Sequence, residues 1–429
     1  MNGCLSAYRM DLRKILSVFA LASLLAGVLI FNVSIKPAQA ASQIYVNIAM
    51  PDDTGDGLTP ATAKRTIRAS LDLAVEGDTV NVAAGTYPEN VYIERSISLL
   101  GAGSSIVTVA AFNPFVDALA ITAHGVSVSG FTFSGANASN TVAGVHLIGA
   151  ENCNISDNVL TGNRFGIWTF GAHRNTISGN EAGNNVLGYF LASSTRNTIE
   201  GNTAVDNFEG FRSQLSSNAN TFTANTATDN FSGFRVMASD NNTFTTNIVR
   251  ENVQGFVLEN NSTGNTIRYN DIFGNQSWGV FSEDTIDATK NWWGANTGPL
   301  HATNLTGTGD EVSDNVTFVP WLDGPFATPP SIDSINLAEG QTVSGIYTIN
   351  VGPSWVVNGL PLDDIVQMDF FVDGVFKATD VTAPYSYDWD TTVHASPHTV
   401  RVVATNVLGT TGEATVNVNV LETLPYAGR

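Results

Sequence analysis

The sequence has few cysteines and few basic residues, and each shortage excludes a class of protein. Only two cysteines occur among 429 residues, and Cys4 lies close to the N-terminus. With Cys153 as the single other cysteine, the chain has no disulfide framework and must be stabilised by its core and its hydrogen-bonded sheets. Lysine and arginine total 19 against 39 aspartates and glutamates, a net charge of −20. Because phosphate binding needs a basic surface, this balance argues against a nucleic-acid partner.

Charged residues are also scarce, at 14% of the chain, whereas hydrophobic residues reach 43%. That hydrophobic share is enough for a buried core and excludes wholesale disorder. The 39 glycines, together with many asparagines and threonines, favour short strands and tight turns over surface helices. At roughly 100–200 residues per domain, a chain of this length is expected to form two domains.

An export signal peptide is predicted over residues 1–40. Three basic residues precede an apolar run from 15 to 31, and Ala38 and Ala40 supply the small residues of a cleavage site. The alternative is a retained membrane anchor, because the run approaches spanning length. No second run could span a bilayer. The predicted location is therefore secreted, extracellular or at the cell surface, without membrane contact after cleavage.

The middle of the chain repeats with a period of 22 or 23 residues. Two successive copies read Asn175-Thr-Ile-Ser-Gly-Asn180 and Asn197-Thr-Ile-Glu-Gly-Asn202. Each copy holds two short alternating strands that cannot bury their apolar faces alone, so the copies must stack roughly 4.8 Å apart. The predicted fold is a right-handed parallel β-helix. Its corners should carry an amide ladder made of Asn158, Asn180, Asn202, Asn225, Asn247, Asn270 and Asn291.

The limits of this solenoid are also predicted. Residues 66–75 form the one convincing amphipathic helix, with Ile67 and Leu71 on its apolar face, and should cap the N-terminal coil. The β-helix is expected over 41–327. From 328 to 429 short alternating strands separated by turns predict a small β-sandwich, so the whole chain is all-β.

The ends of the repeat carry a family resemblance. The segments Asp56-Gly-Leu-Thr-Pro-Ala-Thr62, Ala84-Gly-Thr-Tyr-Pro-Glu-Asn90 and Asn291-Trp-Trp-Gly294 resemble the first and last coils of the pectin-lyase-like superfamily, in its carbohydrate-binding and sugar-hydrolase repeat branch. The resemblance implies a parallel β-helix over residues 44–325. It implies no single reaction, because the superfamily includes lyases, hydrolases, epimerases, adhesins and scaffolds. The C-terminal part resembles bacterial immunoglobulin-like modules, which act as spacers or adhesive units.

One outer face of the coils is predicted to bind glycan. In each glycine-led strand the second and fourth residues after the glycine should point outward. Aromatic rings would pack against sugar C–H groups, while the polar side chains would bond hydroxyls or carboxylates. The predicted binding residues are His146, Trp168, Phe170, Phe190, Arg212, Gln214 and Arg235. The alternative is that this face is covered and its rings belong to a core.

Catalytic residues are harder to assign. Glycoside hydrolysis needs two carboxylates, and Glu259 and Glu283 occupy equivalent positions on successive coils. A lyase would need cations beside a sugar carboxylate, which Arg212 and Arg235 could supply. Both acids could equally be solvated surface groups. No complete catalytic motif is present, so the sequence leaves open whether the chain is an enzyme.

A second acidic column consists of Asp206, Asp229 and Glu251 at the corners of consecutive coils. Ca²⁺ could bridge two of these carboxylates, and exposed turn acids are the alternative. No other cofactor is predicted. The β-helix proteins that assist copper-enzyme maturation share this repeat, but the dispersed histidines offer no Cys/His/Met copper site.

These observations predict a secreted, monomeric, carbohydrate-binding β-helix protein whose partner is an extracellular polysaccharide. Lyase or hydrolase activity is one extension of this prediction. The alternative function is a non-catalytic cell-surface or matrix scaffold or adhesin, in which the β-helix is a rigid rod. The identity of the glycan cannot be read from the residues.

Overall fold

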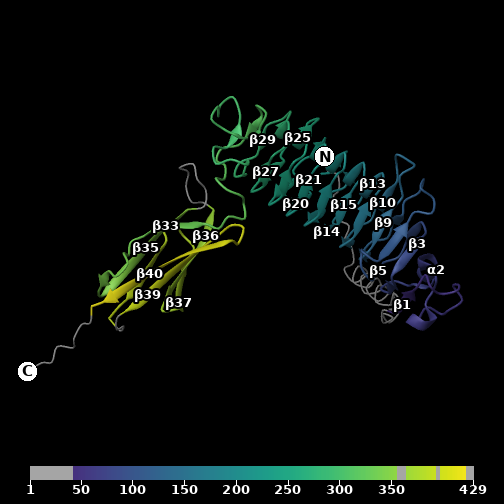
Figure 1. Ribbon diagram of the computed structural model, residues 1–429, viewed down its shortest axis with the longest axis horizontal. Coiled ribbons are helices and arrows are strands. Elements are labelled where there is room, and N and C mark those ends of the chain that lie inside the picture. Colours follow the sequence, from purple (N-terminus) through teal and green to yellow (C-terminus); the bar gives the residue numbers. More distant parts are fainter. Residues whose placement is uncertain (1–41, 355–363, 393–396, 422–429) are drawn as a thin grey trace, which may run out of the picture. The chain divides into compact units, whose positions relative to one another are not determined.

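The computed structural model describes residues 42–354, 364–392 and 397–421, and the predicted export signal, residues 1–40, lies outside them. Figure 1 shows a long stack of parallel coils followed by a smaller part built of antiparallel strands. This confirms the prediction of an all-β chain with a parallel β-helix and a C-terminal β-sandwich. In the described ranges no helix is long and apolar enough to cross a membrane.

The coils contribute strands to three parallel sheets, here named A, B and C. Sheet A comprises β1 (Gln43–Val46), β2 (Thr79–Val82), β5 (Ser98–Gly101), β8 (Ser127–Ser129), β11 (Asn154–Ser156), β14 (Thr176–Ser178), β17 (Thr198–Glu200), β20 (Thr221–Thr223), β23 (Thr243–Thr245), β26 (Thr266–Arg268), β29 (Ile286–Asp287) and β32 (Val316–Thr317). Sheet B comprises β3 (Gly85–Pro88), β6 (Val107–Ala110), β9 (Thr132–Ser134), β12 (Val159–Thr161), β15 (Glu181–Gly183), β18 (Thr203–Val205), β21 (Thr226–Thr228), β24 (Ile248–Arg250) and β27 (Asp271–Phe273). Sheet C comprises β4 (Val91–Ile93), β7 (Leu119–Ile121), β10 (Ala143–Ile148), β13 (Phe165–Phe170), β16 (Leu187–Ala192), β19 (Glu209–Gln214), β22 (Ser232–Met237), β25 (Gln254–Glu259) and β28 (Trp278–Ser282).

The predicted asparagine ladder forms at the corner between sheets A and B. Asn180 donates from Nδ2 to Oδ1 of Asn202 at 3.0 Å, and its backbone N–H donates to the same oxygen at 2.9 Å. Two further corners carry ladders of their own. These consist of Asn163, Asn185, Asn207, Asn230, Asn252 and Asn275, and of Asn175, Asn197, Asn220, Asn242 and Asn265. Buried side-chain amides thus satisfy the backbone at all three corners.

Cys153 occupies the position below the third ladder. Its backbone N–H donates to Oδ1 of Asn175 at 2.8 Å, and its side chain is buried. Burial raises the pKa of the Cys153 thiol, which keeps the sulfur protonated and unreactive. Cys153 is therefore the buried structural thiol that its place in the repeat predicts.

Stacked rings fill the centre of the coils. Tyr189, Phe211, Phe234 and Phe256 lie one above the other with ring centroids 4.5–4.8 Å apart and nearly parallel planes. Because each coil repeats the register of the last, a ring on one coil meets the same kind of ring on the next. This column packs edge-to-face against Phe222 and Phe244 of sheet A.

The N-terminal coil is covered as expected. Helix α2 (Ile67–Leu73) follows a 3-10 turn, η1 (Pro60–Thr62). Its N-cap residue is Thr66, whose side chain accepts a hydrogen bond from Ala69 N–H. Ile67 is buried and Leu71 packs against the core. Toward the other end, β30 (Pro299–Leu300) pairs with β31 (Gly309–Glu311), and Trp293 is fully buried.

The C-terminal part has its own core. One sheet holds three strands, β33 (Ser331–Ile335), β35 (Ile346–Ser354) and β38 (Ser386–Asp390). The other holds β34 (Thr342–Val343), β40 (Thr411–Val420), β39 (His398–Asn406), β36 (Ile365–Val372) and β37 (Val375–Asp380). Alternate residues of these strands, Trp389 and Phe370 among them, form the buried layer that a sandwich requires.

Candidate functional site

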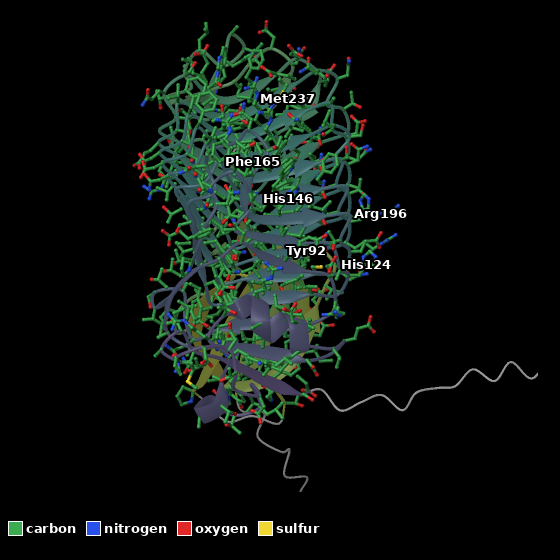
Figure 2. All side chains as sticks on the ribbon, turned by 90° about the vertical axis from the view of Figure 1, so that its right-hand side faces the viewer. Tyr92, His124, His146, Phe165, Arg196 and Met237 are labelled. Carbon is green, nitrogen blue, oxygen red and sulfur yellow. The ribbon has the colours of Figure 1, made fainter. Side chains whose placement is uncertain are left out.

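The predicted binding residues lie on the outer face of sheet C, in strict register. Pairing of successive strands places His146, Trp168, Phe190, Arg212, Arg235, Val257 and Phe281 in one column. A neighbouring column contains Ile148, Phe170, Ala192 and Gln214. Figure 2 shows how Tyr92, His146, Phe165 and Met237 follow one another along this face of the coil stack.

The aromatic residues of the first column stack on one another. His146 lies 3.9 Å from Trp168 between ring centroids, and Trp168 lies 5.8 Å from Phe190, with planes within 10° in both pairs. His146 and Phe190 are each only 7% exposed. The expectation that these two rings offer free faces to a sugar is therefore wrong. The spacing of the coils matches the spacing of stacked rings, so the rings cover each other.

Phe170 differs from its neighbours. Its ring is turned 61° from the plane of Trp168 and is 46% exposed. The residue in register on the next coil is Ala192, so no ring covers Phe170 from that side. Beyond Ala192 in the same column lies Gln214, whose side-chain amide has no hydrogen-bond partner within the described part of the chain. Phe170 and Gln214 thus place an exposed apolar ring and a polar group in the same column of sheet C.

The two arginines of the face are held by buried or half-buried carboxylates. Glu209 is 1% exposed and lies 3.0 Å from Nη1 of Arg235 and 3.3 Å from Nη1 of Arg212. Glu259 lies 2.8 Å from Nη2 of Arg235. Burial alone would lower the pKa of Arg235, but Glu259 and Glu209 outweigh it and raise that pKa. The four charges cancel, so neither arginine is available as a free cation for a sugar carboxylate.

Glu209 was not among the predicted residues, and the reason is a break in the strand alternation. Strict alternation would place the residue before the glycine inside the coil. A Cβ on Gly210 would lie 2.7 Å from the carbonyl oxygen of Gly233 on the next coil, so only glycine fits there. The residue before each glycine then turns outward, which places Phe165, Leu187 and Glu209 on the outer face.

The predicted catalytic acids have partners within the protein. Glu259 is paired with Arg235, and Oε2 of Glu283 accepts the backbone N–H of Asn260 at 2.7 Å. The contacts of Arg212 and Arg235 are equally internal. Catalysis by Glu259, Glu283, Arg212 or Arg235 stays a prediction to which the geometry adds no support.

The acidic column Asp206, Asp229 and Glu251 marks a row of left-handed corners. All three residues have φ between 55° and 59° and are exposed. Asp229 accepts a hydrogen bond from Thr228 and Glu251 pairs with Arg250. Throughout the described ranges, no three His, Cys, Asp or Glu side chains gather in a way that could hold a metal ion. The left-handed corners are sufficient to explain the column, and Ca²⁺ binding by Asp206, Asp229 and Glu251 stays a prediction.

His146 forms a carboxylate–imidazole pair. Its Nδ1 lies 3.0 Å from Oδ2 of Asp117, whose other oxygen accepts the backbone N–H of Ala143 at 2.7 Å. His146 Nε2 and Trp168 Nε1 are buried and find no hydrogen-bond partner among the residues that the structure describes. Such groups cost stability when they stay unpaired. His146 is consequently a member of the packed outer layer, oriented by Asp117.

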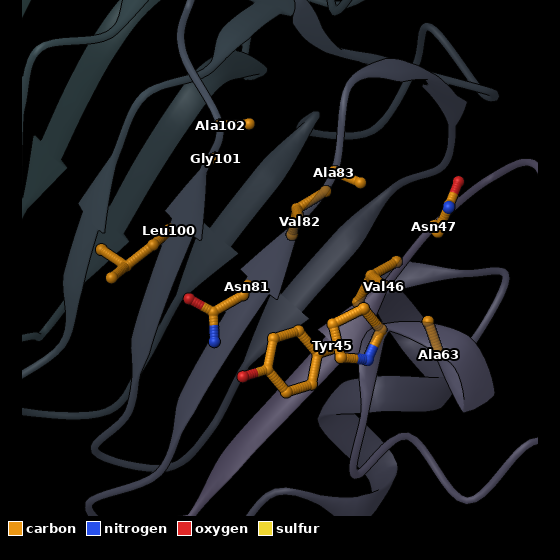
Figure 3. A pocket seen from close by; sticks show the side chains of 11 residues that line it. Tyr45, Val46, Asn47, Ala63, Asn81, Val82, Ala83, Leu100, Gly101 and Ala102 are labelled. Carbon is orange, nitrogen blue, oxygen red and sulfur yellow. The ribbon is translucent and has the colours of Figure 1, made fainter.

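A separate hollow lies over the first strands of sheet A (Figure 3). It has a volume of about 480 Å³, and Tyr45, Asn81 and Leu100 supply outward side chains from three neighbouring strands. The Asn81 amide already donates to Gln43 Oε1 at 2.7 Å. No charged side chain is among the residues that line this hollow, so it offers little to orient a polar ligand.

Comparison with protein families assigns both parts of the chain. The family model described as periplasmic copper-binding protein (NosD) matches residues 74–308, which is more than half of the chain. The chain belongs to the NosD family. The family model described as bacterial Ig domain matches residues 330–402. Among curated proteins, none matches this NosD-family chain.

Several solved structures are similar to this chain over part of its length. A rhamnogalacturonan lyase is 16% identical with a TM-score of 0.41, over 58% of this chain and 74% of that one. The alginate lyase from Paenibacillus sp. str. FPU-7 is 14% identical with a TM-score of 0.38, over 58% and 96%. The fibronectin(III)-like modules of Clostridium thermocellum CbhA are 20% identical with a TM-score of 0.19, over 27% and 54%. This chain thus spans about half the length of the CbhA structure. At such values none of these similarities assigns an activity.

The copper of the family description can be tested against the donors present. Copper sites in proteins use thiolate, thioether and imidazole groups. In this NosD-family chain Cys153 is buried in the core, and Met237 Sδ accepts a hydrogen bond from Arg212. His146 is bonded to Asp117, and Nδ1 of His173 accepts from Thr195 N–H. Because these groups do not converge among the described residues, the side chains do not fit a copper site.

Proposed function

We propose that this NosD-family protein is exported and binds an extended polysaccharide along the outer face of sheet C. The observation that carries the proposal is the exposed Phe170 ring, which stays outside the stacked column and has the unpaired Gln214 amide two coils away. At roughly 4.8 Å per coil, the two lie about 10 Å apart, so they can contact different units of one extended chain. With one sugar ring on Phe170, a later unit of the same chain would bring its hydroxyls toward Gln214.

The charge balance on the outer face of sheet C limits which class of polysaccharide can bind there. Arg212 and Arg235 are balanced by Glu209 and Glu259, and the whole chain carries −20. A polyanion such as a polyuronate would be repelled at low salt. The proposed ligand is therefore an uncharged or amine-bearing polysaccharide. The family description as periplasmic supports an extracytoplasmic location.

The test is affinity electrophoresis of Phe170→Ala and Gln214→Ala in gels that contain hydroxyethyl cellulose, chitosan or alginate. Each variant should lose three-fold or more in affinity for one or both of the first two polymers. Phe170→Ala removes an aromatic contact that contributes about 1 kcal/mol, and Gln214→Ala removes a hydrogen bond of about 1 kcal/mol. Phe376→Ala is the matched control, since Phe376 is an exposed phenylalanine of the C-terminal sandwich. Retardation by alginate alone would contradict the proposed class of ligand, and equal binding by all variants would contradict the site on sheet C. Retardation by none of the three polymers would favour the scaffold function.

A further inference from the structure

A polar groove lies at the N-terminal end of sheet C, between helix α2 and the first strand, β4. It has a volume of about 230 Å³ and is lined by Arg68, Leu71, Asp72, Asn90, Tyr92 and Glu94. A smaller hollow of about 80 Å³ shares Leu71, Asp72, Tyr92 and Glu94 with it. Side chains from the capping helix and from the sheet therefore converge on one concave site.

Tyr92 connects this groove to the face described above. It is in register with Ala120, which in turn is in register with His146, so all three belong to the same outward column. The ring is 49% exposed. Because the next residue in the column is alanine, no ring covers Tyr92 from that side. A chain that follows the outer face of sheet C toward the N-terminus reaches Tyr92 about 10 Å beyond His146.

The charged groups of the groove are not balanced by one another. Within the described residues, neither the Asp72 nor the Glu94 carboxylate has a hydrogen-bond or ion-pair partner, and both residues are exposed. Arg95 lines the smaller hollow and keeps its positive charge, and its guanidinium donates to the carbonyl oxygens of Leu71 and Ala74 at 3.1 and 3.4 Å. The side chains that line the groove itself include one cation, Arg68, and two acids, Asp72 and Glu94. The lining of the groove therefore has an excess of negative charge, which favours a positively charged ligand.

We propose that this groove binds the terminal unit of an amino-sugar polysaccharide. The sugar ring lies on Tyr92, and its protonated amine lies between Asp72 and Glu94. The volume is below the roughly 300–1,000 Å³ of sites for drug-sized ligands, which suits one sugar unit rather than an internal stretch of chain. The inference rests on the proposed function: the groove would bind the terminal sugar unit of a polysaccharide whose other units lie along sheet C.

The experiment uses the full chain and three hexasaccharides in calorimetry at low salt: hexaglucosamine, its fully N-acetylated form and cellohexaose. The double variant Asp72→Asn/Glu94→Gln should bind hexaglucosamine at least ten-fold more weakly and the two uncharged hexamers as the unmodified chain does. Free glucosamine should compete with hexaglucosamine for the unmodified chain but not for the double variant. Both replaced side chains are exposed, so the fold is retained, which circular dichroism can verify.

The matched control is Glu181→Gln/Glu200→Gln, which removes two exposed charges from sheets A and B. An equal loss of affinity for hexaglucosamine in the control would mean that net charge alone attracts the amine. That result would overturn the proposed binding site in the groove. Unchanged binding in the Asp72/Glu94 variant, combined with weaker binding in Phe170→Ala, would overturn the groove and leave the sheet C function standing. If the unmodified chain binds none of the hexamers, both proposals fail.

Discussion

Glu209→Gln removes one negative charge from a position that is 1% exposed while keeping the shape of the side chain. The carboxylate holds Arg212 and Arg235 at 3.3 and 3.0 Å. Removing one partner of a buried ion pair costs about 3–5 kcal/mol, because the other charge stays buried without compensation. Both arginines here keep about a quarter of their side-chain surface exposed. Solvent screening should therefore reduce the cost to about 2–3 kcal/mol.

Urea unfolding followed by tryptophan fluorescence measures this change. Glu259→Gln is the matched control, because Glu259 holds Arg235 alone and its side chain is 25% exposed. The control should cost less than about 1 kcal/mol, as more exposed pairs do. The difference between the two variants should shrink in 1 M NaCl, where repulsion between Arg212 and Arg235 is screened. Equal stability of Glu209→Gln and the unmodified chain would refute the assignment of Glu209 as the buried anchor.

The same variant tests the charge argument. With Glu209 neutral, the four-residue cluster changes from a net charge of zero to one positive charge. We expect Glu209→Gln to be retarded by alginate in affinity electrophoresis at low salt, whereas the unmodified chain is not. If the unmodified chain already binds alginate as tightly as the variant, the balance of charges on this face does not select the ligand.

Two further predictions concern the coil stack. Asn202→Ala should cost about 3–5 kcal/mol in urea unfolding, because the Asn202 amide bonds Asn180, Ile177 O and Asn225; a cost below about 1 kcal/mol would show that the ladder is dispensable. Burial raises the pKa of Asp271 to about 6 from 3.8, so the folded state favours its protonated form and loses stability as pH rises through 6, by on the order of 3 kcal/mol. Asp271→Asn should therefore raise Tm at pH 8 and leave it unchanged at pH 4, and a larger gain at pH 4 would contradict this sign.

The coil architecture was predictable because the same sequence pattern recurs in successive coils. A period of 22 or 23 residues, kept over several copies, specifies which residues lie above one another without any knowledge of the final coordinates. The first asparagine ladder and the position of Cys153 followed from that alignment alone. The second and third ladders use the same period, so they could have been found by aligning every asparagine, not only those that end each copy.

Exposure on the outer face was not predictable from the same alignment. Register places Trp168 between His146 and Phe190, but whether three aligned rings present faces or edges depends on their rotation about χ angles. The structure shows that they stack. The sequence did not predict Glu209 because the assignment assumed that side chains alternate strictly between the inside and the outside of the coil. The glycine column interrupts this alternation, so the residue before each glycine points outward.

One sequence rule for ligand-binding rings follows from this packing. In the sheet C columns of this chain, a ring covers the ring in register on the next coil and leaves little of either face exposed. A face remains free where the next coil carries a small residue. The rule applies to the strands and not to the corners, where Phe208 and Phe231 stack on each other and are still 52% and 43% exposed. Phe170 is followed by Ala192 and Tyr92 by Ala120, and these are the two rings of the sheet C columns that are about half exposed. Replacing Ala192 by phenylalanine should therefore extend the stack over Phe170 and abolish glycan binding without removing any contact residue. Retained affinity in Ala192→Phe would show that the sugar approaches Phe170 from another side.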